Sequence, residues 1–297
     1  MRDDFAIFIP SYDRCEILKQ KTLHMLKEYN YSGKWYVVVD DNDPQLEIYK
    51  EKIPEEHLLI FHKPDYYDYY DTCYNKKNIE AKLYPVAFID DISKKLDLKY
   101  YLMLDDDITK FLFRYNDNGK LLSKDLNYKT FEKFLTYYTD FLNDTCYSVI
   151  SFDISDLLVG GVQNILMKNG YNYNLSGICM KKVNSDFKFC NVFNEIAASL
   201  QLNALKGNYV ITLPYVFFNT KFIVKDEYTI YKRDRGGCEK QYGIQGTVPY
   251  NNVLIILMVA PSFFLYMELV NDKINTVKKK MKKKNYYPKI IDYRWKK

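Results

Sequence analysis

The sequence has little that would cross-link the chain or bind zinc. Its six cysteines include no C-x-x-C pair, and no histidine stands near them at the spacing of metal ligands. They occupy positions 15, 73, 146, 179, 190 and 238. A chain of 297 residues, 47% of them hydrophobic, can build a core without a disulfide framework. We therefore expect reduced cysteines and an intracellular, cytoplasmic protein.

A membrane-spanning run is also missing. The most apolar region, 253–267, is interrupted by Pro261, whereas crossing a bilayer takes about 20 uninterrupted apolar residues. The start of the chain, Met1–Asp4, lacks the basic beginning and the long apolar stretch of a signal peptide. We expect no membrane partner, and we interpret 253–267 as buried core.

No internal repeat and no Pro- or Ser-rich linker divides the chain, but its charge is uneven. Residues 278–297 hold ten Lys or Arg and one acid, Asp292, a net charge of +9 that leaves residues 1–277 with −4. Such a tail is either a solvated chain end or a contact with a polyanion. We expect one domain over 1–250, followed by an apolar segment and basic tail over 251–297.

Strand and helix signals alternate in the first half of the chain. Short apolar runs predict strands at 5–9, 35–39, 58–61 and 100–104. Helical patterns cover 17–26, where Thr22 shares the apolar face, and 78–92, where Pro85 predicts a break or kink. Further on, we expect helices at 131–142 and 192–205, the second stopped at Gly207, and strands at 147–152 and 209–218.

This alternation predicts an α/β fold with a mostly parallel sheet flanked by helices. Ligands of such sheets bind outside the carboxyl ends of the strands. Four acidic positions or clusters follow predicted strand ends, so we expect them in one crevice. They are Asp13, Asp40, Asp41 and Asp105–Asp107.

The strongest local signal is the triplet Asp105–Asp107 after the strand at 100–104. Three adjacent carboxylates repel one another unless a cation or donor groups compensate them. Mg²⁺ or Mn²⁺ typically takes one or two carboxylates, with water and substrate phosphate completing its shell. A nucleotide diphosphate-sugar is such a substrate. The alternative explanations are a solvated acidic turn and a helix N-cap cluster.

The order of these motifs resembles the nucleotide-binding half of GT-A glycosyltransferases. Residues 7–14 read I-F-I-P-S-Y-D-R, residues 37–41 read V-V-V-D-D, and the D-x-D motif of that fold matches the triplet. The resemblance implies a GT-A, Rossmann-like domain with a nucleotide-sugar-binding half at 1–110 and an acceptor half at 111–250.

Within that fold, the sequence is most similar to the phage TET-associated glycosyltransferase family, whose members glycosylate hydroxymethylated pyrimidines in DNA. The similarity rests on Y-Y-L-M-L-D-D-D-I at 100–108, an asparagine-containing segment at 75–78, an acidic helix start at Asn194-Glu195 and the pair Gly236-Gly237. It extends over most of 5–245. Asn194 departs from the acidic residue expected there.

The resemblance implies a role for each matching residue. Asp105 and Asp107 would hold Mn²⁺ or Mg²⁺, and Asp106 would contact the donor sugar or ribose. All three histidines, His24, His57 and His62, come early, so a further metal ligand must be another residue or water. The nucleoside of a UDP-sugar donor would be framed by Pro10, Ser11, Tyr12 and Arg14, with Asp40 or Asp41.

The acceptor half supplies the other candidates. Glu195 opens a predicted helix and is the candidate general base, with Asp153 and Asp156 as rivals and a solvated or N-capping glutamate as the alternative. The loop containing Arg235, Gly236 and Gly237 combines cations with flexible glycines, so it suits closure over a diphosphate. A surface turn is its other interpretation.

The leading hypothesis is therefore a metal-dependent hexosyltransferase that moves a sugar, most simply glucose from UDP-glucose, onto modified double-stranded phage DNA in the host cytoplasm. The first alternative is the same chemistry on a surface glycan. The second is a non-catalytic nucleic-acid-binding protein, which the acidic strand ends oppose because carboxylates repel phosphate. The sequence leaves the oligomeric state open.

Overall fold

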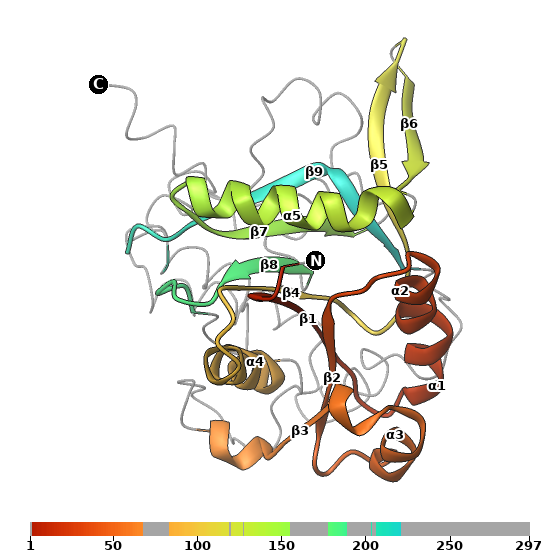
Figure 1. The fold of residues 1–297 in the computed structure, drawn as a ribbon, viewed down its shortest axis with the longest axis vertical. Helices are drawn as coiled ribbons and strands as arrows, with labels where there is room; N and C mark the ends of the chain where they lie inside the picture. Colours follow the sequence, from red (N-terminus) through yellow and green to blue (C-terminus); the bar gives the residue numbers. More distant parts are fainter. Residues whose placement is uncertain are drawn as a thin grey trace, which may run out of the picture.

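The computed structural model describes residues 2–67, 83–118, 120–126, 128–154, 178–188, 203 and 206–220. Within these residues, nine strands form one sheet in the order β3-β2-β1-β4-β8-β7-β9-β5-β6 (Figure 1). The strands are β1 Phe5–Pro10, β2 Lys34–Asp40, β3 Leu58–Phe61, β4 Tyr100–Met103, β5 Ile108–Asp117, β6 Lys120–Asp125, β7 Tyr147–Ile154, β8 Cys179–Lys182 and β9 Tyr209–Thr220.

The sheet has two halves with different pairing. Strands β3, β2, β1 and β4 are all parallel, as the strand–helix alternation predicts. In the other half β7 and β9 pair in parallel, while β8 is antiparallel to both β4 and β7, and β5 is antiparallel to both β9 and β6. The predicted α/β class is confirmed, and its parallel order is concentrated in the half that carries the acidic strand ends.

Helices cover both faces of this sheet. One face carries α1 Cys15–Leu18, α2 His24–Glu28, α3 Leu46–Lys52 and α5 Tyr128–Asp144, and the other carries α4 Leu83–Lys95. A π-helical turn, Lys19–Leu23, joins α1 to α2, so the helix predicted at 17–26 is confirmed as part of a longer one. Short 3₁₀ turns at Glu55–His57 and Lys63–Tyr66 flank β3.

Alternation of side chains along each strand produces two hydrophobic cores. Phe5, Ile7 and Ile9 of β1 point toward α1, α2, α3 and α5, whereas Ala6 and Phe8 point toward α4. Burial of both faces explains why β1 is apolar without interruption. None of the helices in the described residues is long and apolar enough to cross a membrane.

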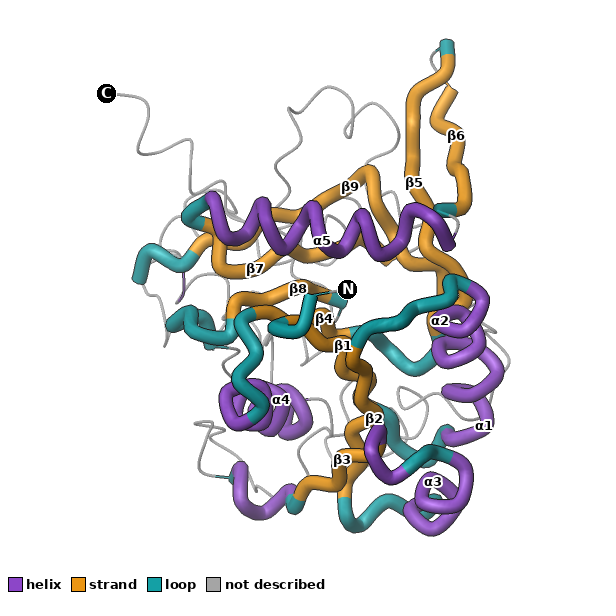
Figure 2. The backbone as a smooth tube through the Cα atoms, in the orientation of Figure 1, coloured by secondary structure: helices purple, strands orange, loops and turns teal. Residues whose placement is uncertain are grey.

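Three elements differ from the sequence prediction. Helix α4 is continuous through Pro85 from Leu83 to Lys95, so no break occurs within this range, and the part of the predicted helix at 78–82 lies outside the described residues. The hairpin β5–β6 was not predicted, because Lys, Asn and Asp interrupt its apolar positions. Beyond Phe113, strand β5 pairs only with β6, and the hairpin extends away from the rest of the described fold (Figure 2). The short strand β8 was also missed.

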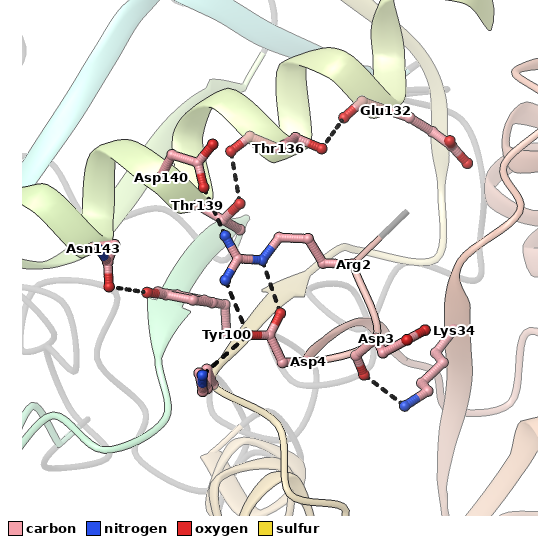
Figure 3. A network of polar contacts seen from close by, with 11 residues as sticks. Arg2, Asp3, Asp4, Lys34, Tyr100, Glu132, Thr136, Thr139, Asp140 and Asn143 are labelled. Carbon is pink, nitrogen blue, oxygen red and sulfur yellow. Dashed lines mark hydrogen bonds and ion pairs between the residues drawn. The ribbon is translucent and has the colours of Figure 1, made fainter.

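An ionic network at the amino end of β1 ties the sheet to α5 (Figure 3). The Arg2 guanidinium contacts Asp4 at 2.8 Å and Asp140 of α5 at 2.6 Å, and it lies 5.2 Å from the centre of the Tyr100 ring. The Tyr100 hydroxyl donates to Asn143 at 3.0 Å. Side-chain bonding to Asp4 is the main reason that the pKa of Arg2 is raised. This network lies at the sheet end opposite the acidic triplet.

Candidate active site

The acidic triplet and the turn after β1 meet because β1 and β4 are adjacent and parallel. The backbone N–H of Leu104 donates to the carbonyl of Phe8 at 2.9 Å, which extends the pairing to the last residue before the triplet. Pro10 ends β1, and Ser11–Arg14 form the turn that leads into α1. The expectation that Asp105–Asp107 and the turn residues share one sheet end is therefore correct.

Asp106, the middle carboxylate, is buried and has protein partners on both oxygens. Its Oδ2 accepts a hydrogen bond from the Ser11 hydroxyl at 2.8 Å, and its Oδ1 lies 2.9 Å from a guanidinium nitrogen of Arg14. Burial raises the pKa of Asp106 to about 7, against the attraction of Arg14 for the charged form. This carboxylate joins the β4 end to the turn after β1.

Asp105 and Asp107 lie on either side of Asp106 and are less buried. Asp107 is 21% exposed, and its Oδ2 is 3.4 Å from Arg14, a longer contact than the one Arg14 makes with Asp106. Burial is the main reason that the pKa of Asp107 is raised, and the charge of Asp105 adds to it. The two flanking carboxylates are thus close enough to repel each other.

Thr22 fixes both ends of the triplet from the helical segment that follows the turn. Its hydroxyl donates to the backbone carbonyl of Asp105 at 2.8 Å and accepts from the backbone N–H of Ile108 at 2.9 Å. The side chain is fully buried. A polar residue on the apolar face at 17–26 was the sequence signal for this contact, although its role was missed.

Three consecutive backbone N–H groups of the turn are bound by side chains that follow β2. Asp13 donates to Asp43 Oδ2 at 2.8 Å, Arg14 to the Tyr49 hydroxyl at 3.1 Å, and Cys15 to Gln45 Oε1 at 3.0 Å. Free N–H groups before a helix form a common anion site. Here protein side chains already occupy these three, and sequence reasoning missed all of them because the pairs are at least 30 positions apart.

The acids after β2 have separate environments. Asp40 is buried and accepts from the backbone N–H of Asn42 at 3.0 Å, and burial is the main cause of its raised pKa. Asp41 is 35% exposed and lies 2.5 Å from Nδ1 of His62. Burial acts to raise the pKa of Asp41, but hydrogen bonds with His62, Asp40 and the backbone of Asn42, together with the charge of His62, lower that pKa on balance. His62 follows β3, so β1, β2, β3 and β4 all contribute to this end of the sheet.

Several predicted residues lie outside the described residues. These are Glu195, Asp156, Arg235, Gly236, Gly237 and the tail at 278–297. Tyr12 is described and half-buried in the turn, and Asp153 is described only as a backbone position of β7. Roles assigned to all of these residues stay predictions.

Among the described residues, no group of three or more His, Cys, Asp or Glu side chains is arranged to hold a metal ion. The donor set nevertheless fits a metal that is shared with a substrate. Asp105 and Asp107, which flank the buried Asp106, carry two hard oxygen donor groups. Two carboxylates suit Mg²⁺ or Mn²⁺ when phosphate and water complete the shell.

The sequence of this chain matches a known protein family. The family described as TET-Associated Glycosyltransferase matches residues 5–226, more than half of the 297-residue chain. The chain belongs to the TET-associated glycosyltransferase family. The matched range contains both the turn after β1 and the acidic triplet. The α/β class predicted from the sequence is confirmed by the sheet and its helices, and the glycosyltransferase assignment is confirmed by the family match. No curated protein matches the chain.

Solved structures similar to this glycosyltransferase include the fragment 1–349 of S. aureus TarS in complex with UDP-GlcNAc, with 14% identity and a TM-score of 0.41 over 86% of this chain and 67% of that one. Another is the mannosyltransferase PcManGT from Pyrobaculum calidifontis with GDP-Man and Mn²⁺, with 12% identity and a TM-score of 0.45, covering 94% and 79%. A third is glucosyl-3-phosphoglycerate synthase from Mycobacterium tuberculosis with Mn²⁺, UDP-glucose and phosphoglyceric acid, with 8% identity and a TM-score of 0.38, covering 74% and 73%.

Proposed function

We propose that this glycosyltransferase uses a divalent metal and a nucleotide diphosphate-sugar to glycosylate hydroxymethylated pyrimidines in DNA. Metal dependence is proposed because the three aspartates of the triplet have different surroundings. Asp106 is bonded on both oxygens by Ser11 and Arg14, while the flanking carboxylates of Asp105 and Asp107 lie beside each other. UDP-glucose is the first donor to test.

Asp105 and Asp107 would hold Mn²⁺ or Mg²⁺ together with the donor diphosphate. The metal would neutralise the charge that develops on the departing diphosphate. Asp106 would act mainly by orienting Arg14 and Ser11, which would place these two residues, with Pro10 and Tyr12, around the nucleoside. Asp41, the more exposed acid after β2, is the better candidate than Asp40 for a contact with the nucleoside.

The bound N–H groups of Asp13, Arg14 and Cys15 also bear on the donor. Because side chains of this protein occupy them, the diphosphate would be bound by the metal and by cationic side chains rather than by this helix start. Arg235, with Gly236 and Gly237, would supply such a cation from a closing loop.

Transfer requires removal of one proton from the acceptor. In an inverting reaction the acceptor hydroxyl oxygen bonds to the anomeric carbon, the bond from that carbon to the diphosphate oxygen breaks, and Glu195 takes the hydroxyl proton. The diphosphate leaves with the bonding electron pair. Asp153 and Asp156 are the rival bases, and a retaining reaction would not need this role.

Family membership and the basic tail favour DNA as the acceptor. The tail at 278–297 carries +9 on a chain whose remainder carries −4, and clustered cations bind DNA phosphates without reading sequence. A hydroxymethyl group on a duplex base is reached either by flipping that base out or from the major groove. A surface glycan is the second candidate acceptor, because the site chemistry at Asp105–Asp107 concerns the donor alone.

Mass spectrometry of nucleosides tests this function. The full-length protein is incubated with Mn²⁺, UDP-glucose and duplex DNA that contains 5-hydroxymethylcytosine, and other UDP-sugars are run in parallel. We expect a hexose added to the modified nucleoside, and none when EDTA is present. Transfer to glycans with no transfer to DNA would contradict DNA as the acceptor and favour a surface glycan. Full turnover in the presence of EDTA would refute the proposed dependence on a divalent metal ion.

A further inference from the structure

The segment 43–49 makes several hydrogen bonds to the turn after β1 and to the start of α1. Besides accepting the N–H of Cys15, Gln45 donates through Nε2 to the carbonyl of Asp13 at 3.2 Å. Asp13 has a φ of 55°, a left-handed conformation that is uncommon for residues other than glycine. The contacts from 43–49 hold the turn in this conformation.

Tyr49 occupies the centre of these contacts. Its side chain is completely buried, and its hydroxyl accepts from the backbone N–H of Arg14 at 3.1 Å and lies 2.6 Å from the Ser11 hydroxyl. Ser11 donates its own proton to Asp106, so the Tyr49 hydroxyl must be the donor in the contact with Ser11. Burial raises the pKa of Tyr49, which keeps this hydroxyl protonated.

We propose that Tyr49 is a positioning residue for donor binding, acting through Ser11 and Arg14. The inference rests on the proposed function, because it takes Ser11 and Arg14 to contact the nucleotide. A single hydroxyl orders both groups. It sets the direction of the Ser11 hydroxyl toward Asp106, and it holds the backbone of Arg14 where the guanidinium reaches Asp106 and Asp107.

The consequence is a binding site that is ordered before the donor arrives. A preorganised site loses less conformational freedom when it binds a ligand, so its ligand binds more tightly. The Tyr49 hydroxyl contacts Ser11 and the backbone of Arg14, and in this proposal Tyr49 contacts neither the metal ion nor the reacting atoms. Its loss should therefore weaken donor binding without slowing the chemical step, which appears as a raised KM at nearly constant kcat.

The matched pair Tyr49→Phe and Tyr29→Phe tests this role in the full-length protein. Tyr29 is also buried, and its hydroxyl accepts a backbone N–H, that of Phe111, at 2.9 Å, but it lies at the end of α2. The probe is UDP with MnCl₂, measured by calorimetry, together with the KM and kcat of UDP-glucose consumption. We expect Y49F to bind UDP about tenfold more weakly and to raise KM similarly, because two hydrogen bonds are lost.

Y29F should keep the UDP affinity and the KM of the wild type. Equal UDP affinity in Y49F and the wild type would overturn the positioning role and leave the proposed function intact. Failure of the wild type to bind UDP with Mn²⁺ would overturn the proposed function, and the positioning role with it.

If Y49F does not fold, Gln45→Met, at a half-buried position, tests the ordering of the turn by the segment 43–49, on which the positioning role of Tyr49 depends. It removes the bonds to Cys15 and Asp13 while keeping the length of the side chain. An unchanged UDP affinity in Q45M would then count against the inference.

Discussion

Three adjacent aspartates of this glycosyltransferase have different environments, although their chemistry is identical. Asp106 is buried and bonded to Ser11 and Arg14, whereas Asp107 is 21% exposed and its contact with Arg14 is longer, at 3.4 Å. Asp105 is held through its backbone carbonyl by Thr22. Removal of the middle carboxylate and removal of a flanking one should therefore have different effects.

Asp107→Ala should abolish transfer while the fold survives, and Asp106→Ala should destabilise the fold. Loss of Asp107 removes a proposed metal ligand, so we expect turnover to fall by about 10²-fold or more. Loss of Asp106 removes the carboxylate acceptor of the buried Ser11 hydroxyl and the shorter of the two carboxylate contacts of Arg14, which lowers the free energy of unfolding by about 1–3 kcal/mol. Transfer assays and urea denaturation separate the two. Near-normal turnover of D107A would contradict the metal role.

The ion pair between His62 and Asp41 should respond to pH. Bonding to Asp41 raises the pKa of His62, and Asp41 has a lowered pKa, so the charged pair persists between these two values. The contribution of His62 to stability is complete below its unfolded pKa of about 6.5 and is lost as the pH rises through the raised folded value. That of Asp41 is present above its unfolded pKa and is lost as the pH falls through the lowered one.

Titration of the His62 ring by NMR, in the wild type and in Asp41→Asn, measures this coupling. The His62 pKa should fall toward its ordinary value in D41N, because the neutral amide no longer attracts the imidazolium. An unchanged His62 pKa would show that the two side chains are not paired in solution.

At the scale of elements, the helical segment from Cys15 to Glu28 supports the triplet as well as the core. Met25 and Leu26 pack into the apolar cluster, while Thr22 is buried beneath the β4 end and bonds on both sides of the aspartates. The π-helical turn Lys19–Leu23 contains Thr22. Such turns occur often at functional sites.

Thr22→Val should destabilise the protein more than Thr139→Val does. Both threonines are completely buried, and valine nearly matches their shape. T22V leaves the N–H of Ile108 without its acceptor, which we expect to cost about 1–3 kcal/mol. The Thr139 hydroxyl donates only to the carbonyl of Thr136 in the same helix, so T139V should cost under about 1 kcal/mol. Chemical denaturation compares the two, and equal losses would refute the bridging role of Thr22.

At the scale of the whole molecule, strand β8 joins the two halves of the sheet. It lies between β4 and β7 and is antiparallel to both, and Tyr101 pairs with Lys181 in the register. The Lys181 ammonium is buried against Asp90 of α4 at 2.5 Å, and the Tyr101 hydroxyl donates to the same oxygen at 2.8 Å. This buried pair links β8 to the helix on the far face.

Lys181→Met should lower the free energy of unfolding by about 3–5 kcal/mol, because it leaves a buried carboxylate without its cation. In the double variant K181M with Asp90→Leu, most of that loss should be recovered, since apolar replacement of both partners removes the uncompensated charge. Guanidinium denaturation of the wild type and the two variants measures this. A double variant as unstable as K181M would contradict the ion-pair explanation.

The basic tail yields a prediction about the complete chain. Truncation after Val277 should weaken binding to duplex DNA and flatten its salt dependence, since each lost phosphate contact removes about 0.9 from the log–log slope. Donor hydrolysis without an acceptor should persist, because the described site residues lie within 10–107. Fluorescence anisotropy over a salt series measures the slope. Absence of DNA binding by the full-length protein at low salt would refute the DNA acceptor.

Much of the fold could be predicted from the sequence because hydrophobic periodicity is a local property. The strands β1, β2, β3, β4, β7 and β9 and the helix α5 were predicted from apolar runs and from spacings of three and four. The approach of Asp105–Asp107 to the turn after β1 was predicted as well, because parallel strands end at the same edge. The sequence motifs predicted similarity to this family over most of residues 5–245, and the family match covers residues 5–226.

Only the tertiary structure decided which aspartate is bonded by protein groups, and how the turn is held. Ser11 is 38 positions from Tyr49 and 95 positions from Asp106 in the sequence, so no local sequence pattern predicts the hydrogen bonds between them. The same holds for β8, a four-residue strand that is defined by the two strands it lies between. Periodicity determines which face of an element is buried, whereas the partner of a buried polar group depends on which elements the fold brings together.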